Sequence, residues 1–272
     1  MNQIEKFKSR FSEEILDIMV LTLEAVSGGI VMENYLRPSM NFAASVDMNT
    51  GVLSNEVGRL EWLVKKGAEN KWGFNFEQYK IYRIKARKNI PVELTECMSK
   101  VMNNCYMVIE VTDMNATEPR LEKMREELSK PAVIENEIGK FTLDRTVSWF
   151  EGKCDWCGES CNVCLVTDDE FGSTAKKAET VLKKLYEYIA ATDDKYREFA
   201  AQDMLECAND WMEDDEQLTK EEFKKKISLD AVIISPDGEV TAYYNDDDMF
   251  GGHMIVVEID ANGELIGVDM AG

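Results

Sequence analysis

The sequence predicts an α+β protein with a smaller α+β N-terminal domain, residues 1–135, and an acidic C-terminal domain, residues 139–272, built as an antiparallel β-meander with packed helices. Length supports two domains, because 272 residues are enough for two separate cores. Composition supports a globular chain, since 44% of the residues are hydrophobic and only 5 are proline. The break Ser129-Lys130-Pro131 lies between the two halves.

The N-terminal half begins with apolar residues that recur at helical spacing from Phe11 to Val26, which predicts an amphipathic helix. The segment NFAASVDMNTGVLS reads as strand, turn and strand. A strand is expected in FEQYKIYRIKARK, where apolar and basic residues alternate, and another in CYMVIEVTD. A short helix should follow over residues 118–128, because Pro119 suits a first helical turn.

The C-terminal half opens with KFTLDRTVSWFEG and SCNVCLVTDDE, which read as paired strands. A long helical region is expected from Thr174 to about Glu213, with a break and a new N-cap at Thr192-Asp193-Asp194. Thr219 and Glu222 form a capping box that starts another helix. The segments LDAVIIS, EVTAYYND, HMIVVEID and ELIGVDMAG then predict the meander, with Asp-Gly and Asn-Gly at two of its turns.

Charge is unevenly distributed along the chain, whose net charge is −21. Residues 139–272 hold 13 basic and 31 acidic side chains, whereas residues 1–138 hold 18 and 21. Because affinity for nucleic acid depends on Lys and Arg near phosphates, we expect no nucleic-acid partner. An acidic surface favours a basic protein partner, although the same charge also serves solubility alone.

The N-terminus, MNQIEKFKSR, shows no apolar signal core. The apolar run from Ile15 to Met32 is interrupted by Asp17, Glu24 and two glycines, so we expect no membrane span. Seven cysteines, an odd number, favour free thiols in a reducing compartment. The sequence therefore predicts a cytoplasmic protein; it does not determine the oligomeric state.

Four cysteines form two C-x-x-C pairs in CDWCGESCNVC: Cys154, Cys157, Cys161 and Cys164. If Cys157-Gly158 is a hairpin turn, Cys154 lies opposite Cys161, while Cys164 points to the other face. Four sulfurs arranged in this way do not converge on one metal ion, and a redox pair is favoured at a helix N-terminus instead. We therefore expect incidental hairpin cysteines and no metal or cofactor, with a four-cysteine metal site as the alternative. The other cysteines read as buried small residues: Cys97, Cys105 and Cys207.

His253 is the only histidine of the chain. It follows the acidic turn Asp246, Asp247 and Asp248 and the corner that begins at Phe250. One hypothesis is a His–carboxylate acid/base pair or a ligand site at this corner. The other is that the histidine braces the start of a strand while the aspartates line a solvated turn.

Trp211 precedes the acidic run Glu213 to Glu216. We expect the tryptophan in the core and the acidic run at a solvated helix end. If Trp211 is exposed instead, an aromatic side chain beside an acidic rim is suited to anchor a protein partner.

Several motifs occur in an order that resembles the bacterial family Domain of Unknown Function 2262: GKFTLDR, WFEG, NDWMEDDE, the F-x-G-H segment from Phe250 to His253, and the terminal AG. The resemblance covers roughly Gly139 to Gly272, and the first half resembles the region that often precedes this family. It implies homology but no activity. Cysteines stand after WFEG where the family is expected to have an ordinary hairpin, which supports a local role for them.

No catalytic residue set assembles from these observations. The leading hypothesis is a non-enzymatic interaction protein, immunity- or antitoxin-like, whose acidic face binds a basic protein partner such as a nuclease. The alternatives are an enzyme or small-ligand binder around His253 and Asp246–Asp248, or a metal site at Cys154–Cys164.

Overall fold

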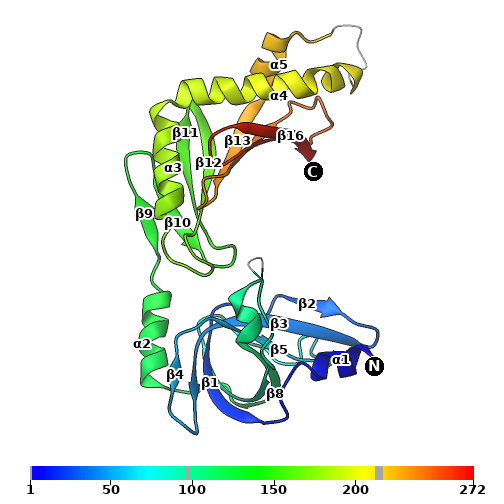
Figure 1. Ribbon diagram of the computed structural model, residues 1–272, viewed down its shortest axis with the longest axis vertical. Coiled ribbons are helices and arrows are strands. Elements are labelled where there is room, and N and C mark those ends of the chain that lie inside the picture. The colour runs from blue at the N-terminus through cyan, green and yellow to red at the C-terminus, as the bar shows by residue number, and fades with distance from the viewer. Residues whose placement is uncertain (1, 96–97, 212–216) are drawn as a thin grey trace. The chain divides into compact units, whose positions relative to one another are not determined.

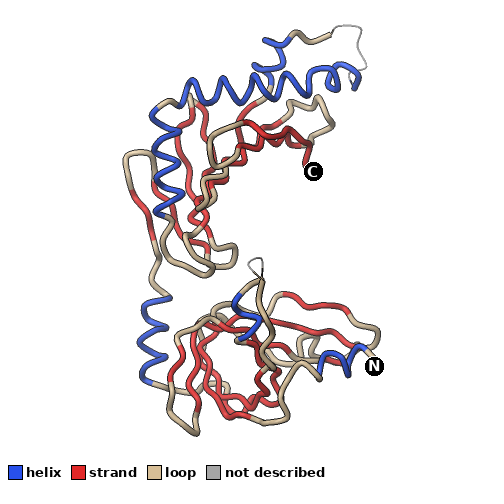
Figure 2. The backbone as a smooth tube through the Cα atoms, viewed as in Figure 1, coloured by secondary structure: helices blue, strands red, loops and turns tan. Residues whose placement is uncertain are grey.

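The computed structural model describes residues 2–95, 98–211 and 217–272 and has a mixed α+β fold (Figures 1 and 2). The chain divides into two compact units, Met1–Lys130 and Pro131–Gly272. The second unit includes the residues just after Pro131 because strand β9 (Val133–Glu135) pairs with β10 (Lys140–Asp144). No helix among the described residues has the length and apolar character that a membrane crossing requires.

Unit one is mostly β-structure. Its strands are β1 (Leu16–Thr22), β2 (Gly28–Val31), β3 (Tyr35–Asp47), β4 (Leu53–Ser54), β5 (Gly58–Glu61), β6 (Val64–Lys65), β7 (Ile81–Lys88) and β8 (Cys105–Asp113). Its helices are α1 (Gln3–Lys8), the 3₁₀ helix η1 (Lys100–Asn103) and α2 (Pro119–Leu128).

The sheet of unit one closes on itself. Its strand order is β1-β7-β8-β5-β3, and β3 pairs back onto β1. Side chains inside this ring form a core that includes Phe42, Trp62, Tyr82 and Ile84, each no more than 1% exposed. The strands predicted in FEQYKIYRIKARK and CYMVIEVTD are confirmed as β7 and β8, and the helix predicted over residues 118–128 is confirmed as α2.

The helix predicted from Phe11 to Val26 is wrong, because this segment contains β1. β1 pairs with β3 on one side and β7 on the other. Val20 and Leu21, neighbours that point to opposite faces, are both fully buried. A strand buried on both faces loses the alternation of apolar and polar residues, and its apolar run then also satisfies helical spacing.

The described residues of unit two form one large sheet and three helices. Its further strands are β11 (Trp149–Trp156), β12 (Glu159–Val166), β13 (Ser228–Ile234), β14 (Val240–Asn245), β15 (Met254–Ile259) and β16 (Leu265–Ala271). Its helices are α3 (Lys176–Glu187), α4 (Ile189–Trp211) and α5 (Lys220–Lys226).

The sheet of unit two follows chain order from β9 to β16. Neighbouring strands pair antiparallel except β12 and β13, which are parallel. The sequence prediction of a purely antiparallel sheet is therefore wrong at this pairing. Three helices separate β12 from β13, and a long crossover of this kind is what allows two parallel strands to lie side by side.

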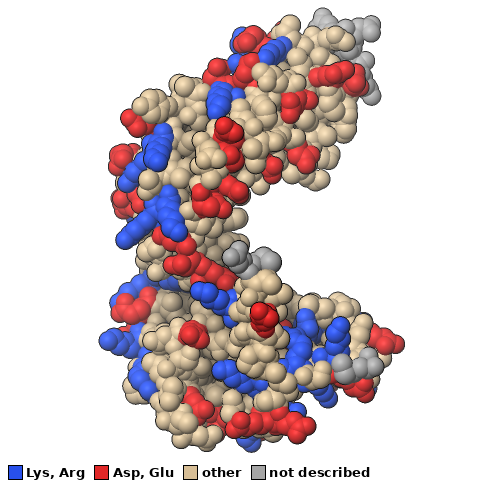
Figure 3. Space-filling view, in the orientation of Figure 1, with Lys and Arg blue, Asp and Glu red and all other residues tan. Residues whose placement is uncertain are grey.

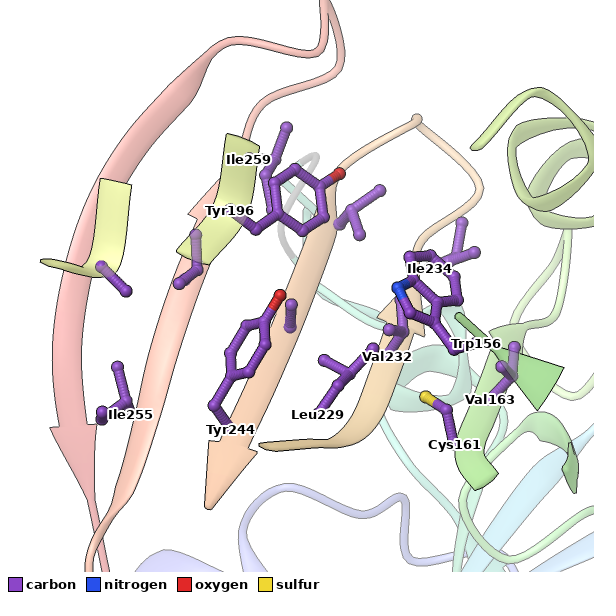
Figure 4. Packing of buried hydrophobic residues seen from close by; sticks show 14 of the residues in the cluster. Trp156, Cys161, Val163, Tyr196, Leu229, Val232, Ile234, Tyr244, Ile255 and Ile259 are labelled. Carbon is purple, nitrogen blue, oxygen red and sulfur yellow. The ribbon is translucent and has the colours of Figure 1, made fainter. Parts of the chain in front are cut away.

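The core of unit two lies between the sheet and its helices. Large side chains of the strands that are no more than 1% exposed include Phe141, Phe150, Trp156 and Tyr244. Figure 4 shows strand residues such as Val232 and Ile234 together with Tyr196 of α4 in this cluster. Burial of these apolar surfaces supplies most of the stabilisation of the unit.

The break in the long helical region lies at Tyr188, between α3 and α4, and not at the predicted Thr192-Asp193-Asp194. Asp193 is 8% exposed inside α4, where it forms an ion pair with Arg197 one turn later. Its carboxylate is therefore engaged by a side chain and does not cap a new helix. The predicted capping box of Thr219 and Glu222 at the start of α5 is confirmed.

Candidate functional site

The cysteine hairpin has the register that the sequence predicts. Cys154 lies opposite Cys161 and Trp156 opposite Glu159, with Cys157-Gly158 as the two-residue turn. Both turn residues have positive φ, 56° and 90°. Such a turn matches the right-handed twist of its two strands.

The four sulfurs are divided between the core, the turn and the opposite face of the sheet. Cys154 and Cys161 are buried in the helix-covered core, Cys157 is exposed, and Cys164 points to the other face. A hydrogen bond that the Cys161 thiol donates to Cys154, together with burial, raises the pKa of Cys161, so its thiol stays protonated at neutral pH. Within residues 2–95, 98–211 and 217–272, no cluster of three or more His, Cys, Asp or Glu side chains is placed to hold a metal ion.

The remaining cysteines lie apart from the hairpin. Cys105 is buried, as predicted, and burial raises its pKa to about 12. Cys207 is half-buried on α4, so the prediction of a buried residue is wrong there. Cys97 lies outside the described residues.

Asp246 organises the loop that carries the lone histidine. It is 4% exposed. Its Oδ2 accepts hydrogen bonds from the backbone N–H groups of Phe250 at 2.7 Å and Gly252 at 3.2 Å. Its Oδ1 accepts one from Asp248 at 3.2 Å. Both oxygens of this carboxylate therefore already accept hydrogen bonds from the backbone of its own loop.

His253 directs its Nδ1 to the carbonyl oxygen of Phe250, 2.6 Å away. A carbonyl only accepts, so Nδ1 carries the proton and Nε2 is the acceptor of the neutral ring. The exposed carboxylate of Asp247 instead pairs with Lys226 at 2.7 Å. The loop thus braces the histidine through its backbone and presents no carboxylate to Nδ1.

Trp211, which was expected in the core, is 52% exposed. Its ring packs edge-to-face against two other rings. The distance between ring centroids is 5.8 Å to Phe250 and 6.4 Å to His253. Phe250 itself is fully buried. We call Trp211, Phe250 and His253 the aromatic corner. The prediction that Trp211 is buried is wrong because α4 ends at this residue, beyond the protection of the core.

Exposed acidic side chains lie on both segments that carry the residues of the aromatic corner. Asp203, Glu206 and Asp210 are exposed at positions i, i+3 and i+7 of α4, so they share one face of the helix that ends at Trp211. Asp248 is exposed in the histidine loop. Figure 3 shows acidic side chains distributed over unit two. The acidic run Glu213–Glu216 lies outside the described residues.

One buried charged cluster was not predicted from the sequence. Arg197 Nε donates to Asp193 at 2.7 Å, and the hydroxyl of Tyr244 donates to the same carboxylate at 3.3 Å. The guanidinium also donates to the carbonyl oxygens of Lys224 and Ile227 at the end of α5. Burial, together with the Asp193 charge, raises the pKa of Tyr244 well above its usual value. Every charged member has a partner, so the cluster joins α4, α5 and β14 as a structural brace.

The comparisons with known proteins agree with the division into two units. Residues 3–128 match the family model described as a domain of unknown function (DUF7021). No curated protein sequence and no solved structure matches the chain. Residues 135–270, half of the chain, match the model described as an uncharacterized protein conserved in bacteria (DUF2262). The chain therefore belongs to the DUF2262 family, as its GKFTLDR, WFEG and NDWMEDDE motifs imply.

Proposed function

We propose that this chain is a non-enzymatic protein-interaction module, immunity- or antitoxin-like, that binds a basic protein partner through its acidic C-terminal unit. The observation that carries the proposal is the aromatic corner, where Trp211 is held by two ring contacts yet 52% exposed. Tryptophan is the residue type most often found at the energetic centre of a protein interface.

The position of Trp211 gives it the properties of an interface anchor. Its edge contacts with Phe250 and His253 restrict the ring before any partner binds. A restricted side chain loses less conformational entropy on association than a free one. The exposed half of the indole can then contact a partner with its apolar surface, and the side chain does not have to change conformation to do so.

The charge of the unit supports a basic partner. Residues 139–272 carry 13 basic and 31 acidic side chains. Carboxylates at Asp203, Glu206 and Asp210 lie on the helix that ends at Trp211. Complementary charge accelerates association and selects partners of opposite sign.

The partner is sought by native mass spectrometry of the tagged protein, purified gently from its own cells under reducing conditions. We expect a stoichiometric complex with a basic protein that dissociates as salt is raised, since exposed charge attraction is screened. A bare chain mass, or a complex insensitive to salt, contradicts the proposal.

The role of Trp211 is tested by Trp211→Ala, which should weaken the captured complex by at least about 2 kcal/mol. The matched control is Tyr188→Ala, because Tyr188 is also an exposed aromatic, 66% exposed. It immediately precedes the first residue of α4, so the length of that helix places it about 35 Å from Trp211 at 1.5 Å per residue. Equal affinities of the two variants would show that the aromatic corner does not contact the partner.

A further inference from the structure

A groove in unit two lies away from the aromatic corner, where the α3–α4 junction meets the turns after β13 and β15. Its volume is about 330 Å³. Apolar walls come from both helices and from the strands: Val181, Leu185, Val240 and Ile259. Polar groups come from Lys184, Thr192, Lys195, Tyr196 and Asn262. A cavity of this size accommodates a small organic molecule.

The hydroxyl of Tyr196 is the unusual feature of this groove. The residue is 3% exposed, and its hydroxyl has no hydrogen-bond partner in the described parts of the chain. Figure 4 shows its ring beside Ile259, and both residues line the groove. The hydroxyl oxygen is not among the buried polar atoms that lack a partner, so it opens onto the groove and is free to donate to a molecule there. Burial raises the pKa of Tyr196 to about 12, which keeps the phenol protonated and able to donate.

Two lysines make the groove locally cationic within a strongly acidic unit. Lys195 Nζ donates to the carbonyl oxygen of Gly263 at 2.9 Å, which fixes the ammonium beside the turn. Lys184 is exposed at the rim and forms no ion pair with the residues that the structure describes.

The carboxylate in the lining, Asp260, is hydrogen-bonded within its own turn. It accepts hydrogen bonds from the N–H of Asn262 at 2.9 Å and the N–H of Glu264 at 2.8 Å. It also accepts one from the side-chain amide of Asn262 at 3.1 Å. Its oxygens are therefore directed into the turn, and the donors that remain for a ligand are the two ammonium groups and the Tyr196 hydroxyl.

We propose that this groove binds a small amphipathic anion, with a carboxylate or phosphate head group held by Lys184, Lys195 and the Tyr196 hydroxyl. The apolar body of the ligand packs against Val181, Leu185 and Ile259. The site is separate from the protein-binding role proposed above and does not depend on it. Ammonium and phenol donors explain the preference for an anion, since hydrogen bonds to a charged acceptor are the stronger ones.

The test is a ¹H–¹⁵N titration of the full chain at neutral pH with three probes that share one apolar body: sodium octanoate, octyl phosphate and 1-octanol. We expect saturable shifts at the amides of Thr192, Tyr196 and Gly263 with at least one anion. The tighter of the two anions identifies the head group. Octanol should bind about tenfold more weakly, because it offers no charge to the lysines.

Variants locate the site and separate it from non-specific binding. Lys184→Ala and Tyr196→Phe should each weaken binding of the better anion about tenfold. The control is Lys183→Ala, because Lys183 is the adjacent residue but pairs with Glu179 at 2.8 Å and does not line the groove. Shifts that do not saturate, equal binding of octanol, or equal effects of Lys183→Ala and Lys184→Ala would overturn the proposal.

Discussion

At the scale of single residues, Arg197 connects several elements of unit two. It bridges Asp193 on its own helix, Glu159 in the cysteine hairpin and two carbonyl oxygens at the end of α5. Its guanidinium also lies 5.4 Å from the centre of the Tyr244 ring. Arginine suits this position because its planar fork of donors satisfies several acceptors at once.

Arg197→Ala should therefore destabilise the protein by about 3 kcal/mol, because it leaves the carboxylate of Asp193 buried without its cation. Urea unfolding followed by circular dichroism measures the change. The control is Lys140→Ala, whose partner Glu135 is 70% exposed, and which should cost less than about 1 kcal/mol. Similar losses in the two variants would show that the buried cluster is not a brace.

At the scale of single elements, α3 receives its N-terminal cap from the loop that precedes it and not from its own N-cap residue. Ala175 at the N-cap position has no side chain able to accept. Asp168 replaces it, accepting from the N–H groups of Lys176 at 2.9 Å and Lys177 at 3.0 Å. Burial raises the pKa of Asp168, but these hydrogen bonds outweigh burial and lower the pKa below its usual value.

Asp168→Ala should destabilise the protein at pH 7 by about 1 kcal/mol, the usual cost of a lost N-cap. The pKa of Asp168 is lower in the folded state than in the unfolded state. Its stabilisation of the fold is therefore complete above the unfolded-state pKa of about 4. It is lost as the pH falls through the lower folded-state value. Unfolding curves from pH 7 to pH 2 should therefore converge for the two proteins at the acidic end. A constant difference at every pH would contradict this assignment.

The cysteine hairpin offers a stabilising substitution. Cys157 has φ of 56°, a conformation that asparagine adopts at lower cost than other non-glycine residues. Cys157→Asn should therefore stabilise the protein by about 0.5 kcal/mol, as judged by urea unfolding. Cys157→Val is the opposing control, since a β-branched residue at positive φ should destabilise the turn. Stabilisation by valine would show that the turn is not held in this conformation.

At the scale of the whole molecule, the two units differ in how their charge is balanced. Residues 1–138 hold 18 basic and 21 acidic side chains, whereas residues 139–272 hold 13 and 31. Like charges on a compact unit repel one another and reduce its stability. Screening by salt should relieve this repulsion mainly in unit two.

Raising NaCl from 10 to 150 mM shortens the screening length from about 30 Å to about 8 Å. Hydrogen exchange measured by mass spectrometry should then slow in peptides from residues 139–272 and change less in peptides from residues 1–130. Equal slowing in both units would indicate a general salt effect instead of relief of charge repulsion.

The sequence by itself determined the features that depend on a few neighbouring residues. The Cys157-Gly158 turn, the Thr219 and Glu222 capping box and the register of the hairpin all follow from short-range geometry. The strand β7 was predictable for a related reason, since alternation along a strand is a local pattern.

Only the tertiary structure decided the features that depend on distant partners. β1 is a strand because it pairs with both β3 and β7, and β13 pairs parallel to β12 across a crossover long enough to contain helices. The exposure of Trp211 and the unpaired hydroxyl of Tyr196 likewise depend on which elements surround them. Local propensity contains no information about such neighbours, because burial and hydrogen-bond partners are set only when distant segments pack together.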